Sequence, residues 1–297
     1  MNKRLAAFFI VEHQEFQEYM ADDARQIASR AGYDLEVFFC DGQAVTQIEQ
    51  LFSVIRLPEN ERPAGLIVEP IAGDGHARVA QAAARVGIGW VVVNDVFDYM
   101  SALRAEYPAL PISSVSRSEV AIGAIQGQQC RALQPSGGEL LYLQGPVRSK
   151  SAVGRAEGFR DELADSGLLI QDLIGDWTES GGEEAMKRWL RFITNASKLP
   201  KTICCQNDSM AVGARRALRS AMPEASDVAI TGCDGLPKGG QALVRAGELT
   251  ATVVTPSPAG PAAKLIIDFW EKQTPAAATV TLAPTSFPSI ADLSARS

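Results

Sequence analysis

Histidine is scarce in this chain, which contains only two among its 297 residues. His13 and His76 are too few for a histidine-rich metal site, so we predict no metal ligand. We expect His13 to follow a strand, where it can contact a ligand, and His76 to be solvated at a helix start. The chain also lacks a phosphate-binding P-loop and the nucleophile elbow G-x-S-x-G. An enzyme therefore has no supporting motif, and we predict no catalytic residue and no cofactor.

The chain also has fewer basic than acidic residues and no long apolar run. Lysines and arginines number 28 against 35 aspartates and glutamates, and the net charge of −7 disfavours nucleic-acid binding. No run approaches the about 20 apolar residues of a membrane-spanning helix, so we predict no direct membrane insertion. The early run Leu5–Val11 is better explained as a buried strand than as a signal peptide. The chain is then either cytoplasmic or a periplasmic protein whose signal peptide has been removed.

The five cysteines are an odd number and show no disulfide pattern. Cys204 and Cys205 are adjacent in a predicted strand, so their side chains point to opposite faces and are poor disulfide partners. Cys40 and Cys233 also lie in or at the end of apolar strands. We therefore expect buried, inert thiols, a pattern that favours a reducing compartment.

What the chain does have is a regular alternation of short apolar strands and helical segments. Continuous apolar strands indicate burial on both faces of a parallel sheet, and the alternation is typical of repeated βαβ units. The predicted strands are Leu5–Val11, Leu35–Cys40, Gly65–Val68, Trp90–Val93, Ile112–Val115, Leu140–Leu143, Leu168–Ile174, Thr202–Cys205, Val228–Thr231 and Thr250–Val254. The predicted helices are Phe16–Ala31, Val45–Arg56, His76–Val86, Val120–Ala132, Ala152–Asp165, Glu183–Ile193, Ser209–Ser220, Gln241–Ala246 and Ala262–Trp270.

The alternation breaks at three places, which suggests two lobes between which the chain passes three times. Residues 96–111 read as irregular and contain two prolines, and further breaks fall at Pro256-Ser257-Pro258 and near Pro284. We predict an N-terminal lobe of residues 1–113 plus 256–283 and a C-terminal lobe of 114–255 plus 284–297. The expected fold class is α/β, with two similar doubly wound parallel-sheet lobes joined by a multi-strand hinge and a ligand cleft between them.

Nearly every predicted strand is followed by an amide, a carboxylate or an aromatic residue. Because open α/β sheets bind ligands at the carboxyl ends of their strands, we expect these side chains to form a binding site. Carboxylates and amides suit vicinal hydroxyls, arginine offers a rigid fork of donors, and aromatic rings can lie against a sugar ring. The candidate ligand-binding residues at these places are His13, Gln14, Phe16, Glu69, Asn94, Asp95, Arg155, Trp177, Asn207 and Asp234.

Several of these residues also have a purely structural explanation. Asp208 is as well suited to cap its helix as to bind a ligand, and Asp234 with Gly235 is ordinary turn chemistry. Trp177 can fill core, Arg155 can form a surface ion pair, and Glu69-Pro70 can simply begin a loop. Their shared position at strand ends is what favours ligand binding.

Three motifs in the second half carry a resemblance to a known family. They are Gly154-Arg155-Ala156-Glu157-Gly158-Phe159, Gln206-Asn207-Asp208-Ser209-Met210-Ala211-Val212-Gly213-Ala214 and Gly232-Cys233-Asp234-Gly235. With this element order, the chain resembles the type I periplasmic sugar-binding proteins, the ribose-binding-like group related to the ligand-binding cores of lactose-repressor-type regulators. The resemblance implies that Arg155, Asn207 and Asp234 hydrogen-bond sugar hydroxyls. It also implies that Trp177 stacks on the sugar and that Thr255 is a polar hinge residue within reach of the ligand.

The departures from the family pattern lie mostly in the first lobe. An Asn-Pro-Phe-Phe-like segment becomes His13-Gln14-Glu15-Phe16-Gln17, an Asn-Pro becomes Glu69-Pro70, and an Asp-Arg pair becomes Asn94-Asp95. Losing that arginine and gaining Glu69 predicts a more acidic face. An aminosugar, a polyol or another cationic or hydroxylated molecule all remain open as ligands.

We therefore expect a monomeric, non-enzymatic solute-binding protein that closes about its hinge on a sugar-like ligand. Its expected partner is the permease of a sugar ABC transporter if it is exported. The alternatives are a cytoplasmic or receptor-coupled ligand sensor, or a carbohydrate-modifying enzyme that uses Glu69, Asp95 or Asp234 as acid or base. A transcriptional repressor is less expected because no helix-turn-helix precedes the first strand.

Overall fold

The computed structural model of the chain describes residues 2–195, 198–225 and 227–295. It divides into two compact units, Met1–Arg117 with Ser257–Leu282, and Ser118–Pro256 with Ala283–Ser297. Within the described residues, the chain therefore passes from one unit to the other after Arg117, after Pro256 and after Leu282.

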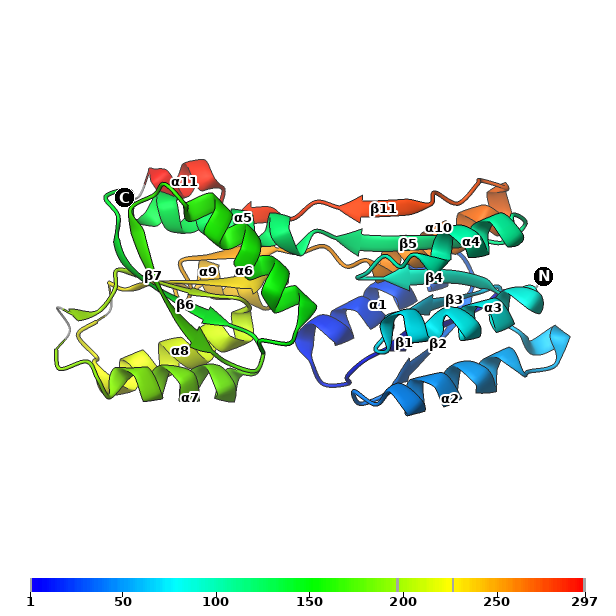
Figure 1. Ribbon diagram of the computed structural model, residues 1–297, viewed down its shortest axis with the longest axis horizontal. Coiled ribbons are helices and arrows are strands. Elements are labelled where there is room, and N and C mark those ends of the chain that lie inside the picture. Colours follow the sequence, from blue (N-terminus) through cyan, green and yellow to red (C-terminus); the bar gives the residue numbers. More distant parts are fainter. Residues whose placement is uncertain (1, 196–197, 226, 296–297) are drawn as a thin grey trace. The chain divides into compact units, whose positions relative to one another are not determined.

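The first unit is built on a six-stranded sheet in which every described pairing is parallel (Figure 1). The strand order is β11-β5-β4-β3-β1-β2. β3 and β4 are buried along their whole length, as expected for apolar strands covered on both faces. The strands are β1 (Arg4–Phe9), β2 (Asp34–Phe39), β3 (Gly65–Val68), β4 (Gly89–Val93), β5 (Ile112–Arg117) and β11 (Thr279–Leu282).

Helices cover both faces of this first sheet. One core cluster joins the sheet to α1 and α10, which contact each other, and a second joins it to α2, α3 and α4. The helices of this unit are α1 (Glu15–Arg30), α2 (Ala44–Ile55), α3 (Ala77–Arg85), α4 (Tyr99–Glu106) and α10 (Ala259–Lys272), with short 3₁₀ turns η1 (Glu59–Glu61) and η2 (Gly73–His76).

The second unit repeats the plan of the first around a second six-stranded sheet. Its order is β12-β10-β9-β8-β6-β7, and only the β10–β12 pair is antiparallel among the described pairings. The strands are β6 (Gly138–Gln144), β7 (Leu168–Ile174), β8 (Thr202–Cys205), β9 (Ala229–Asp234), β10 (Ala251–Val254) and β12 (Thr285–Phe287).

The helices of the second unit also lie on both faces of its sheet. α7 and α8 run side by side in Figure 1 and pack on one face, whereas α5 and α6 pack together on the other. The helices are α5 (Glu119–Leu133), α6 (Lys150–Leu163), α7 (Glu179–Leu190), α8 (Asp208–Ala221), α9 (Gly240–Arg245) and α11 (Ile290–Ser294).

Each sheet has one place where the direction of strand succession reverses. In the first unit this place lies between β1 and β3, and in the second it lies between β6 and β8. Ligands of doubly wound sheets bind in the crevice outside the carboxyl ends of the strands at such a place. The loops that follow these four strands are therefore where a site is expected.

Two sequence-based expectations about the first unit were wrong. Residues 96–111 are not irregular throughout, because α4 occupies Tyr99–Glu106 and the two prolines, Pro108 and Pro111, follow it. Proline ends a helix but does not prevent a helix before it, so the two prolines do not make the preceding residues irregular. His76 is not solvated but fully buried at the end of η2.

The expectation of buried thiols is confirmed. All five cysteines are buried and free. Cys204 and Cys205 contribute to different core clusters, on opposite faces of β8, as their adjacency in a strand requires.

The close contact between α5 and α6 depends on Gly158. Replacing this glycine should therefore destabilise the protein. A Cβ atom at Gly158 would lie 1.9 Å from the carbonyl oxygen of Val120, so the helices could not keep their present distance. We expect Gly158→Ala to lower the free energy of unfolding by about 3 kcal/mol, measured by urea denaturation. Gly75→Ala is the control, because its nearest neighbour would be at 3.4 Å. Equal stability of the two variants would contradict this account of the helix pair.

Candidate functional site

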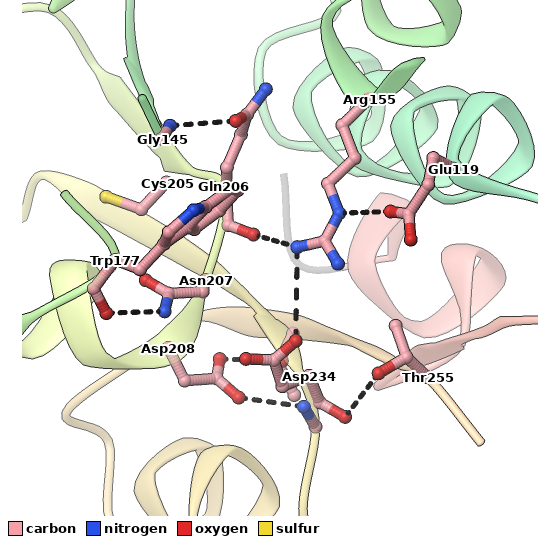
Figure 2. A network of polar contacts seen from close by, with 12 residues as sticks. Glu119, Gly145, Arg155, Trp177, Cys205, Gln206, Asn207, Asp208, Asp234 and Thr255 are labelled. Atoms are coloured by element: carbon pink, nitrogen blue, oxygen red, sulfur yellow. Dashed lines mark hydrogen bonds and ion pairs between the residues drawn. The ribbon is translucent and has the colours of Figure 1, made fainter. Parts of the chain in front are cut away.

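Arg155 is the centre of a polar network at the strand ends of the second unit (Figure 2). Its side chain projects from α6 and is almost fully buried. Nε donates to Glu119 Oε2 at 2.7 Å, and Nη1 donates to the backbone oxygen of Gln206. Burial lowers the pKa of the guanidinium, but the neighbouring Cys233, Glu119 and Asp234 raise it, and the net shift is upward. Arg155 is thus a fixed cation in the interior and not a surface ion pair.

Asp234 ends β9 beside this arginine. Its Oδ1 lies 3.9 Å from Arg155 Nη1, and its side chain keeps 18% of its surface exposed. Its backbone oxygen accepts from the hydroxyl of Thr255 at 3.3 Å, and Thr255 is itself buried. The carboxylate is therefore held in place while part of it remains accessible. Thr255 supports the backbone of Asp234.

Trp177 lies next to Arg155, with its ring held against backbone. The guanidinium carbon lies 5.5 Å from the ring centroid, close enough for a cation–π interaction. A Cβ atom at Gly145 would lie 2.2 Å from Trp177 Cζ2, so the ring needs a glycine after β6. The ring is half-buried at the edge of the α7–α8 core and can present an apolar surface.

Asn207 links the tryptophan to the start of α8. Its Oδ1 accepts from the backbone N–H of Met210 as the N-cap, and its Nδ2 donates to the backbone oxygen of Trp177 at 2.9 Å. One hydrogen of the amide nitrogen remains for another acceptor. Asn207 thus both begins the helix and holds the tryptophan.

Asp208 plays a structural part that the sequence did not resolve. The helix cap is Asn207, and Asp208 is the first helical residue, almost fully buried. Its carboxylate accepts from the Thr252 hydroxyl at 2.7 Å and from the backbone N–H of Gly235 at 2.8 Å. These two bonds join α8 to β10 and to the turn after Asp234, so Asp208 fixes the loop that carries the candidate residue.

Gln206 and Glu119 also belong to this network, although Gln206 was named only as part of a motif and Glu119 was not a candidate at all. The buried Gln206 amide donates to the Tyr142 hydroxyl and to the Ala152 oxygen and accepts from the Gly145 N–H. It thereby ties together the loops after β6 and β8. Glu119 opens α5, 36 positions from its partner Arg155. No spacing pattern within one segment indicates such contacts.

A second buried network lies at the strand ends of the first unit. Glu69 follows β3 and is 9% exposed. Its carboxylate accepts from Gln17 Nε2 at 2.8 Å and from Asn94 Nδ2 at 2.7 Å. Burial raises the pKa of Glu69 above its ordinary 4.5, although Gln17, Asn94 and Arg117 act in the opposite direction. Asn94 Oδ1 is buried and has no hydrogen-bond partner in the described part of the chain.

Phe16 and Arg117 complete this group. The guanidinium carbon of Arg117, the last residue of β5, lies 4.2 Å from the centroid of the Phe16 ring. Phe16 was among the residues predicted from the sequence, and Arg117 was not. The sequence predicts a more acidic face here, and Arg117 adds a positive charge that acts on Glu69.

The remaining candidates of the first unit are more exposed. His13 is largely solvent-accessible, with Nδ1 3.7 Å from Glu18 and Nε2 4.0 Å from Glu12. Gln14 is exposed at the N-cap of α1 and makes no side-chain capping bond. Asp95 is half-buried, and its Oδ1 accepts from the N–H of Val96. Glu69, Asn94 and Phe16 belong to one network, while His13, Gln14 and Asp95 lie on adjoining loops.

Several candidate ligand-binding residues have a strained, left-handed backbone. Among described residues other than glycine, six have positive φ, namely His13, Asp41, Asn94, Trp177, Asp234 and Gln273. Four of these six are candidate ligand-binding residues. Left-handed backbone is costly for such side chains and clusters at functional sites, because there it directs a side chain where a relaxed backbone would not.

The described residues offer neither a membrane-spanning helix nor a cluster of metal ligands. Residues 2–195, 198–225 and 227–295 include no helix that is both long and apolar enough to cross a membrane. The same residues contain no group of three or more His, Cys, Asp or Glu side chains placed to hold a metal ion.

Comparison with known proteins identifies the family. The model for the periplasmic binding protein domain matches residues 8–267. The chain therefore belongs to the periplasmic binding protein family, which confirms the type I family expected from the sequence motifs.

Individual relatives agree with this assignment. The chain is 31% identical to the galactofuranose-binding protein of Escherichia coli over 46% of its own length and 42% of that protein. It is 30% identical to the xylitol-binding protein of Mycolicibacterium smegmatis over 70% of its own length and 54% of that protein. The chain thus spans about half the length of the curated relatives it matches.

A solved structure confirms the fold class. The Caulobacter myo-inositol-binding protein, bound to myo-inositol, matches with a TM-score of 0.77 at 20% identity, covering 99% of this chain and 95% of that one. At this identity the likeness establishes the α/β fold with its two units, as the sequence predicted.

Proposed function

We propose that this protein is a solute-binding protein that binds a sugar or polyol and releases it without chemical change. The ligand would be held in a cleft between the two units by closure about the hinge that connects them. The relatives described above bind galactofuranose, xylitol and myo-inositol, according to their names, and support this class of ligand.

The single observation that carries the proposal is the group formed by Arg155, Trp177 and Asp234. It combines a fixed cation, a partly exposed carboxylate and an aromatic ring at the carboxyl ends of one sheet. Aspartate accepts hydrogen bonds from hydroxyl groups, and the ring can pack against the C–H face of a sugar. One hydrogen bond to a charged group contributes only about 1.5–3 kcal/mol, so a second wall is needed for useful affinity. Glu69 and Asn94 of the first unit are proposed to form it.

The proposal is tested by a thermal-shift screen of the purified protein against sugars, polyols and aminosugars. A ligand at 100 times its dissociation constant adds about 2.7 kcal/mol of stability. We expect at least one neutral polyhydroxyl compound to raise the melting temperature. Native mass spectrometry should show one unmodified ligand per chain after prolonged incubation. A screen without any shift would refute sugar binding, and a converted ligand would identify an enzyme.

The partner and the location of the protein follow from the same proposal. A binding protein of this family would deliver its ligand to the permease of a sugar ABC transporter, and it would act in the periplasm. Pull-down with the permease of a candidate sugar ABC transporter, with and without ligand, tests the partnership. Complex formation that depends on ligand would support transport over a sensor role.

Binding should depend on pH through Glu69. Burial raises the pKa of Glu69 above 4.5, so the carboxylate takes up a proton at a higher pH than an ordinary glutamate. A protonated Glu69 loses the negative charge that accepts ligand hydroxyls, and we expect affinity to fall as pH falls through this raised pKa. Calorimetry between about pH 4 and 8 measures the effect.

Two variants assign that pH dependence to its group. Glu69→Gln should bind more weakly and lose the dependence, whereas His13→Gln should retain it. If the affinity of Glu69→Gln depends on pH as that of the wild type does, Glu69 is not the group responsible.

A further inference from the structure

Arg117 is an arginine that neither the motifs nor the family pattern singled out, and it lies among the candidate residues of the first unit. It is the last residue of β5, where it pairs with Leu282 of β11. Its side chain is half-buried, and its guanidinium carbon is 4.2 Å from the centroid of the Phe16 ring. This cation–π contact places the guanidinium beside the Phe16 ring at the carboxyl edge of the sheet.

The surroundings of Arg117 are tied to Glu69 from two sides. On one side, Gln17, the neighbour of Phe16, donates to Glu69 Oε2, and its own oxygen accepts from the N–H of Ile10. On the other, Asn94 donates to Glu69 Oε1, and its backbone N–H donates to the oxygen of Val115 in β5. Arg117 also lowers the pKa of Glu69 through its charge. The phenylalanine, arginine, asparagine and glutamate thus form one local group.

This group has the same chemical make-up as the one in the second unit. There, the guanidinium of Arg155 lies over Trp177 and near Asp234. Here, the guanidinium of Arg117 lies over Phe16, and its charge acts on Glu69. Each group combines an arginine, a carboxylate and an aromatic ring, and in the second unit Glu119 adds another carboxylate against Arg155.

We propose that Arg117 is a ligand-binding residue that makes the site selective for neutral polyhydroxyl compounds. The inference rests on the proposed sugar-binding function and adds a residue and a ligand class to it. The planar guanidinium presents parallel N–H donors to vicinal hydroxyl oxygens. Glu69 and the unpartnered Oδ1 of Asn94 accept from hydroxyl hydrogens beside it. A cationic ligand is disfavoured because Arg117 repels it where Glu69 alone would attract it.

The test compares affinities by calorimetry for the best neutral ligand of the screen and for its amino-substituted analogue. Arg117→Met keeps an unbranched apolar stem against Phe16 and removes the guanidinium. We expect it to weaken neutral-ligand binding by about ten- to a hundredfold, the loss of one charge-assisted contact. The ratio of amino-analogue to neutral-ligand affinity should rise about tenfold. Arg56→Met is the matched control, because Arg56 also stacks on an aromatic ring, Phe52 at 5.2 Å, and should bind as the wild type does.

A purely structural role for Arg117 gives a different result. Arg117→Met would then melt at a lower temperature without ligand, while affinity and selectivity stayed within about twofold of the wild type. That outcome overturns the inference about Arg117 and leaves the proposed sugar binding intact. If the wild-type protein binds no sugar or polyol, the proposed function itself is wrong. If the variant does not fold, the Nε–Hε resonance of Arg117 in the ¹⁵N-labelled wild type decides. A shift on adding ligand supports the contact, and an unmoved resonance rejects it.

Discussion

Asp234→Ala is expected to abolish the ligand-induced thermal shift while leaving the unliganded protein folded. Asp234 keeps part of its carboxylate exposed beside Arg155, and Arg155 remains held by Glu119 and Gln206 without it. Losing two acceptor oxygens should weaken binding by at least about a hundredfold, since each charged hydrogen bond contributes about 1.5–3 kcal/mol. Calorimetry with the ligand found by screening measures the loss.

The backbone at Asp234 requires a second variant. Its φ of 102° is unfavourable for alanine, so some loss of stability in Asp234→Ala could come from the backbone alone. Asp234→Asn keeps the shape of the side chain and suits such backbone better, while removing the charge. Both variants should lose affinity. Normal binding by either would make Asp234 a turn residue and nothing more.

Asp208→Ala should produce the opposite result, a large loss of stability. The buried carboxylate is the acceptor for the Thr252 hydroxyl and the Gly235 N–H, and its removal leaves both donors buried without it. Leaving buried partners of a charged group unsatisfied costs about 3–5 kcal/mol. Glycines at 232 and 240 make room for the carboxylate, since a Cβ atom at either would lie within 2.1 Å of its oxygens.

Denaturation by urea measures this effect. Asp165→Ala, at an exposed position after α6, is the control and should unfold at the wild-type midpoint. If Asp208→Ala is as stable as the control but fails to bind ligand, then Asp208 contacts the ligand and the structural role assigned to it is wrong. Together, the variants at 208 and 234 separate the residue that holds the loop from the one proposed to bind.

Local patterns were enough to predict the fold class, because apolar strands and amphipathic helices are encoded within short segments. The elements that were missed have weak local signals. β11 is only four residues long with alternating exposure, β12 has three residues, and α4 precedes two prolines. Their structure depends on the sheet edges and helices they pack against, which no short window reveals.

The candidate site shows the same division. That residues such as Glu69 and Asp234 lie at the ends of strands could be predicted from the sequence, because an apolar strand ends where polar residues begin. Which of these residues contact each other could not be predicted. Arg155 contacts Glu119, and Asp208 contacts Thr252, only because the fold brings these distant segments together. Arg117 was not predicted as a site residue, because β5 continues two residues beyond the predicted strand. This extension places Arg117 at the carboxyl edge of the sheet.

The most direct test of the central claim is a crystal structure of the protein with the compound that stabilises it most. We predict one neutral polyhydroxyl molecule hydrogen-bonded to Asp234, packed against Trp177, and contacted from the first unit by Glu69 and Asn94. A compound bound elsewhere on the surface, or one that contacts none of these four residues, would contradict the proposed sugar-binding function.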